Sequence, residues 1–151
     1  MKRVLSRLSR WRMLTNSLHL SVPPCLRGRF AQMIDWSTPE MSAGLACFRR
    51  EQFFEAHEHW EAVWLKSEEP EKTFLQALIQ VAGSLFHFRR DNLGGARSMA
   101  KKALGRLEKY PETYGGVAVE ALRANLRAYL VTLDTEFREI RTLPQIELVS
   151  E

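Results

Sequence analysis

Residues 71–90 constrain the fold more than any other part of the chain, because they are apolar on almost every side of a helix. The segment begins after Pro70 and ends at the turn-forming Asp91-Asn92. Its apolar residues are Phe74, Leu75, Leu78, Ile79, Val81, Ala82, Leu85, Phe86 and Phe88. A helix with so little polar surface must be covered by other elements. We therefore expect it to be the central helix of its domain.

The segments around it also have helical periodicity, bounded by capping and turn residues. Ser37-Thr38-Pro39-Glu40 is a typical helix start, and Tyr110-Pro111 stops a helix. We expect helices at about 39–50, 52–66, 71–90, 93–109 and 116–131, with 132–141 able to continue the last one. No strand-like alternation is present. The prediction is a compact single-domain all-α bundle of about five helices, built on a central antiparallel hairpin formed by 52–66 and 71–90.

The basic residues are concentrated at the N-terminus. Seven of the 22 Lys and Arg residues lie in residues 1–32, which hold no acid, so the other 15 are outnumbered by all 18 Asp and Glu residues. We divide the chain into a basic N-terminal extension (1–36), a helical domain (37–143) and a C-terminal tail (144–151). The mildly acidic body argues against a nucleic-acid-binding domain. The sequence leaves open whether the partner is a protein or a small molecule.

Several interpretations of the basic extension stay open. Its Arg-rich, acid-free, amphipathic composition suits a disordered segment, an organellar targeting peptide, or a helix that binds a membrane surface or RNA. It also suits sequence upstream of a start at Met33. No run of about eighteen apolar residues predicts a transmembrane helix. Cys25 and Cys47 form no metal-binding pair, so a cytoplasmic location is expected, with an organelle as the alternative.

The helix expected at 52–66 carries a cluster of ionisable residues among large aromatic ones. Its sequence is FFEAHEHWEAVW, from Phe53 to Trp64. His57 and Glu61 are one turn apart and share a face, with Glu55 and Glu58 at neighbouring angles. Because Phe and Trp residues interleave with these groups, some of the ionisable side chains must face the interior.

The central helix carries a matching polar line. Gln76, Gln80, Gly83 and His87 follow one another at spacings of four, three and four residues. An unpaired buried polar group costs about 1–3 kcal/mol, so this line predicts a polar partner. The cluster on the preceding helix is the expected partner, with Glu61 near Gln76 or Gln80.

Three hypotheses follow from these two clusters. In the first, His57, Glu61 and His87 bind a divalent transition metal (zinc, iron or manganese), and Glu58 is the general base of a hydrolase, by analogy with HExxH. In the second, the Glu, His and Gln groups form a metal-free polar pocket for a small molecule, with Glu55, Gln76 and Gln80 as binding residues, or they act as an acid–base pair. In the third, the same groups bond one another and only fix how the helices pack.

Three ordered motifs resemble an uncharacterised all-helical family, domain of unknown function 309. They are residues 53–64 with their Glu-Ala-His-Glu core, Phe74–Gln80 ending in Leu-Ile-Gln, and Asn92–Ala96. The resemblance covers about residues 40–130 and implies that the first two motif helices pack together. Members are sometimes described as predicted metal-dependent hydrolases. Ala77 departs from the family, which often has glycine there. We therefore expect either a metal-dependent hydrolase or, as the alternative, a non-catalytic helical interaction module with a structural polar core.

Overall fold

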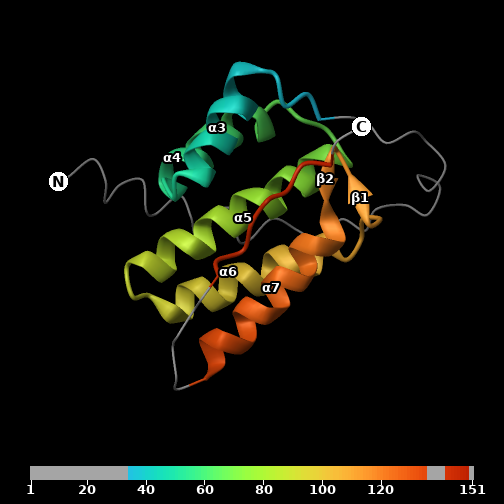
Figure 1. The fold of residues 1–151 in the computed structure, drawn as a ribbon. Helices are drawn as coiled ribbons and strands as arrows, with labels where there is room; N and C mark the ends of the chain where they lie inside the picture. Colours follow the sequence, from blue (N-terminus) through green and yellow to red (C-terminus); the bar gives the residue numbers. More distant parts are fainter. Residues whose placement is uncertain (1–33, 136–141, 150–151) are drawn as a thin grey trace.

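The computed structural model describes residues 34–135 and 142–149. This part contains five helices, which confirms the predicted all-α class (Figure 1). They are α3 (Pro39–Arg49), α4 (Phe53–Trp64), α5 (Glu71–Arg89), α6 (Leu93–Leu107) and α7 (Val119–Asp134). No helix in these residues is long and apolar enough to cross a membrane. The predicted extension up to residue 33, and a continuation of α7 over 136–141, lie outside the described residues.

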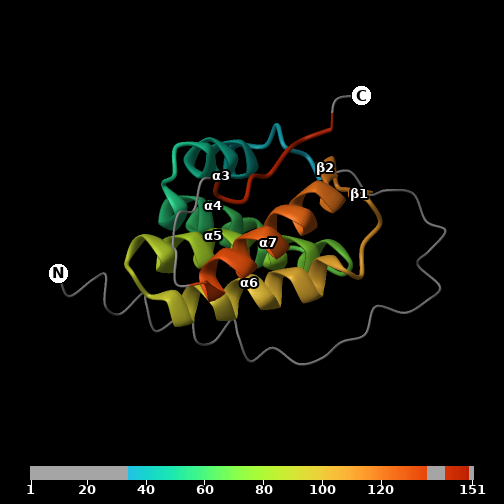
Figure 2. The ribbon, with the colours of Figure 1, turned by 60° about the horizontal axis from the view of Figure 1, so that its bottom comes forward.

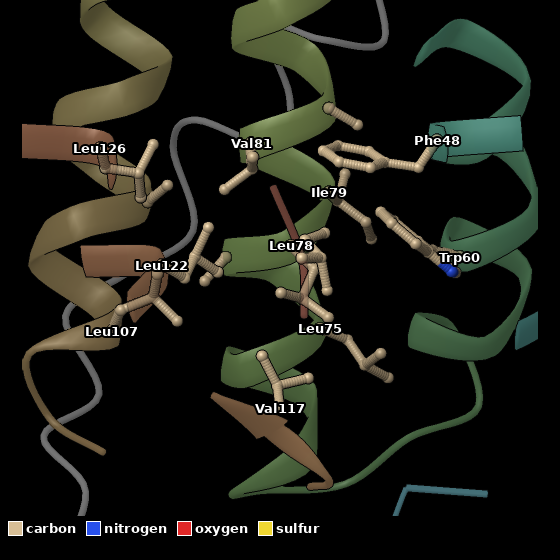
Figure 3. Close-up of a cluster of buried hydrophobic side chains, with 14 of the residues drawn as sticks. Phe48, Trp60, Leu75, Leu78, Ile79, Val81, Leu107, Val117, Leu122 and Leu126 are labelled. Carbon is tan, nitrogen blue, oxygen red and sulfur yellow. The ribbon is translucent and has the colours of Figure 1, made fainter. Parts of the chain in front are cut away.

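Helix α5 is the centre of the fold, as its sequence predicts. Every residue from Phe74 to Leu85 is buried. Figure 3 shows why: side chains of α5 lie between Phe48 and Trp60 on one side and Leu107, Leu122 and Leu126 on the other. The turned view places α3 and α4 on one side of α5 and α6 on the other, with α7 packed on α6 (Figure 2). The polar groups of α5 are therefore held inside a bundle.

Two turns of the same geometry connect α3 to α4 and α5 to α6. Glu51 and Asp91 have left-handed backbone angles, with φ of 61° and 56°. The following residues, Gln52 and Asn92, each donate a backbone hydrogen bond of 2.9 Å to the carbonyl oxygen five residues earlier. This is the Schellman arrangement that ends a helix. Arg89 forms an ion pair with Glu51, which joins the two turns.

A short β-hairpin precedes α7, where the sequence predicted no strand and a helix from residue 116. Strand β1 (Thr113–Tyr114) pairs antiparallel with β2 (Val117–Ala118). Gly115 and Gly116 form the turn with φ of 57° and 79°, angles that favour glycine and suit a two-residue hairpin loop. These glycines take the chain out of helical geometry, so α7 begins three residues later than predicted.

Residues on both sides of the predicted domain boundaries pack against the helices. Ile34 and Ile146 are buried, and the Trp36 Nε1–H donates to the Gly115 carbonyl oxygen at 2.7 Å. Residues 146–149 lie along β2, with Ala118 N–H donating to the Glu147 carbonyl oxygen at 2.9 Å. The division at 36/37 and 143/144 stays a prediction. The hydrophobic core nevertheless includes side chains from both flanking segments.

Candidate functional site

The predicted polar line on α5 consists of two enclosed glutamines and one partly buried histidine. Gln80 is 1% exposed and Gln76 6% exposed, whereas His87 is only partly covered. Gly83, between them on the line, is buried. Because a buried carboxamide without partners is costly, the hydrogen bonds of the two glutamines decide what this line does.

Both glutamines accept hydrogen bonds from Arg106 on α6. The guanidinium donates from Nε to Gln76 Oε1 at 3.3 Å and from Nη1 to Gln80 Oε1 at 3.1 Å. It also donates to the Lys102 carbonyl oxygen at 3.4 Å. Arg106 is not among the site residues predicted from the sequence. Helix α6 carries four basic residues and no acid (Arg97, Lys101, Lys102 and Arg106), and their spacing gives no signal that separates Arg106 from the others.

The chemistry of arginine fixes the orientation of the Gln80 amide. A guanidinium only donates, so Gln80 must turn its oxygen toward Arg106 and its nitrogen away. The Gln80 Nε2 is buried and has no hydrogen-bond partner in the described part of the chain. Arg106 itself forms no ion pair there, and burial lowers the pKa of its guanidinium. Arg106 and Gln80 therefore bring a positive charge and an amide donor without a partner in the described residues close together.

His87 supports the start of α6. Asn92 is the N-cap of α6, and its Oδ1 accepts from the Gly95 N–H at 2.9 Å. This turns the Asn92 Nδ2 toward His87 Nδ1, at 3.1 Å, so Nδ1 is the acceptor of this contact. Burial, with a smaller effect of Arg90, lowers the pKa of His87 and favours the neutral ring that this contact needs. One of the two ring nitrogens is thus committed to the helix cap.

His57 is buried next to aromatic rings. It is 4% exposed, and its ring lies 6.3 Å from that of Phe54. The ring centroids of Phe54 and Phe86 of α5 lie 5.6 Å apart, and those of Phe86 and His87 lie 5.9 Å apart. The two histidines thus border the same pair of phenylalanines, at the opposite end of the line from Gln76.

The acidic residues of α4 lie farther out than His57. Glu55 is exposed, while Glu58 and Glu61 are partly exposed. Over residues 34–135 and 142–149, no group of three or more His, Cys, Asp and Glu side chains is arranged to hold a metal ion. The predicted metal centre therefore stays a prediction, and we derive no catalytic step through a metal. The roles assigned to Glu55, Glu58, Glu61 and the two histidines stay predictions.

Comparison with known proteins agrees with the resemblance predicted from the three motifs. No curated protein matches the chain. Residues 41–99 match the family model described as domain of unknown function (DUF309). This match runs from α3 into α6 and contains both glutamines, but it ends before Arg106. The match at residues 41–99 and the helical architecture are consistent with an uncharacterised DUF309 helical family.

Proposed function

We propose that this domain is a non-catalytic helical module, which acts by binding and whose polar line on α5 is structural. The observation that carries the proposal is the pairing of Gln76 and Gln80 with Arg106. Buried polar groups that bond one another fix how helices pack and require no reaction. His87 supports the same view, because its contact with Asn92 stabilises the cap of α6.

The competing proposal is a metal-dependent hydrolase with His57, Glu61 and His87 as ligands and Glu58 as base. It needs three ligand atoms about 2.0–2.2 Å from one metal ion. Two features weigh against it: the Asn92 contact at His87 Nδ1, and the absence of a three-residue ligand group in the described residues. His87 Nε2 is the nitrogen that a metal would have to use.

Metal analysis of protein purified without an affinity tag distinguishes the two proposals. We expect far less than one zinc, iron or manganese per chain in the wild type and in His57→Ala. We also expect His57→Ala to be less stable, because it empties a buried position. His59→Ala is the matched control, since His59 lies on the same helix and is partly exposed. One metal per chain, lost in His57→Ala but kept in His59→Ala, would overturn the non-catalytic proposal.

A further inference from the structure

Arg106 is a partly buried cation whose hydrogen-bond partners in the described residues are all neutral. Its guanidinium has five N–H groups, and its three contacts all end on carbonyl oxygens at 3.1 to 3.4 Å. Guanidinium–carboxylate bonds are shorter, about 2.7–2.9 Å. In the described residues no carboxylate reaches Arg106, although charges removed from water are normally paired. The guanidinium therefore retains capacity for an anionic acceptor.

Gln80 places a second unused donor beside this charge. Its Oε1 lies 3.1 Å from Arg106 Nη1, and its Nε2 is buried with no partner among the described residues. The two ends of a carboxamide are ~2.3 Å apart, so Nε2 lies at most about 5.4 Å from Nη1. A carboxylate has the same separation between its oxygens and can span such a pair of donors. We propose that a small free carboxylic acid binds between α5 and α6, with one carboxylate oxygen on the Arg106 guanidinium and the other on Gln80 Nε2.

Charge and burial both favour a small monoanion. One guanidinium neutralises one carboxylate, whereas a phosphate dianion would leave a buried excess of negative charge, which is costly. Gln80 is 1% exposed, so a bulky or peptide-borne group has no room to reach its amide. Arg106 is partly exposed, and a ligand enters past it. The other basic residues of α6 raise the local concentration of anions.

The proposal is tested by thermal unfolding of the full chain in sodium acetate and in sodium chloride of equal ionic strength. A ligand that binds only the folded state raises Tm, and we expect a rise of about 2–5 °C in saturating acetate over chloride. Arg106→Gln is expected to abolish the difference. Arg97→Gln is the control on the same helix, because Arg97 is already paired with Asp134, and it is expected to keep the difference.

Gln80→Glu and an NMR titration make the proposal independent of whether Arg106→Gln folds. Gln80→Glu supplies a carboxylate within the chain, so we expect it to fold and to lose the acetate response. In wild-type protein labelled with 15N, acetate is expected to shift the Gln80 side-chain amide signal. Equal Tm values in acetate and chloride, a response that survives in Gln80→Glu, or a response only to phosphate or to a blocked aspartyl peptide would each overturn the proposal.

This inference rests on the proposed non-catalytic role, since it takes the cluster to bind a ligand and not to transform one. The two proposals fail in different experiments. A stoichiometric metal that His57→Ala removes would overturn the role. A metal-free protein whose Tm does not respond to acetate would overturn only the proposal that a small carboxylic acid binds.

Discussion

Replacing Arg106 by methionine tests whether the polar line of α5 is structural. Methionine keeps much of the length and apolar stem of arginine but donates no hydrogen bond. Gln80 then loses the only hydrogen-bond partner that it has in the described residues, while it stays 99% covered. Gln76 loses its bond from Nε. The variant therefore leaves the buried Gln80 oxygen unsatisfied, beside an amide nitrogen that already has no partner in that part of the chain.

The expected cost follows from these contacts. An unsatisfied buried acceptor costs about 1–3 kcal/mol, and removing the partly buried charge of Arg106 offsets part of this. We expect Arg106→Met to lower the free energy of unfolding by about 1–2 kcal/mol. Gln80→Leu is the informative partner variant. It removes the Gln80 amide, and the partly exposed Arg106 can form hydrogen bonds with water. We therefore expect Gln80→Leu to lower the free energy of unfolding by less than about 1 kcal/mol.

Urea unfolding in buffer without carboxylates, followed by tryptophan fluorescence, measures both variants. Trp60 is fully buried in the core and reports the loss of the fold. Both variants should keep the wild-type dependence on urea, so that differences in midpoint are differences in stability. Two results would contradict this expectation: Arg106→Met is as stable as the wild type, or Gln80→Leu loses more unfolding free energy than Arg106→Met. Either result would mean that Arg106 does not satisfy the buried glutamine.

Two further predictions concern α3 and the His87 contact. A Cβ on Gly44 would overlap the indole ring of Trp60, so Gly44→Ala should lower the free energy of unfolding, measured by thermal unfolding, by about 1–3 kcal/mol. In Gly105→Ala nothing lies within 4 Å of the new Cβ, so this variant should instead raise the free energy of unfolding by about 0.5–1 kcal/mol. Equal changes in stability in the two variants would contradict this packing. Burial lowers the pKa of His87 in the folded state, so below its ordinary value of 6.5 the unfolded chain takes up the proton first. Stability should therefore fall from pH 7 to pH 5.5, with a smaller slope in His87→Gln; equal slopes would show that His87 does not cause the fall.

Local signals in the sequence predict the helices but not the hairpin. The apolar run of α5, the Pro39 start and the Asn92 cap each act within a few residues, and each lies where the pattern places it. The pair Gly115-Gly116 is equally local, but before a helical pattern it suits a loose helix start as well as a hairpin turn. The strand pairing of β2 with residues 146–149 joins distant segments, and no local pattern encodes it.

The pairing of Arg106 with the glutamine line depends on how α5 and α6 are aligned, which neither helix encodes alone. Four basic residues on α6 are equivalent in the sequence, and the turn at Asp91-Asn92 decides which of them meets Gln80. The residue spacing on α4 likewise does not encode how this helix is aligned with its neighbours. It places His57 and Glu61 on one face, but a metal site also needs a ligand from a second helix. The expected third ligand, His87, has its Nδ1 in contact with Asn92, in the same turn that brings Arg106 to the glutamines. The turn at Asp91-Asn92 thus aligns Arg106 with the two glutamines, and its Asn92 contacts the Nδ1 nitrogen of His87, the expected third metal ligand. For this reason we favour binding over catalysis.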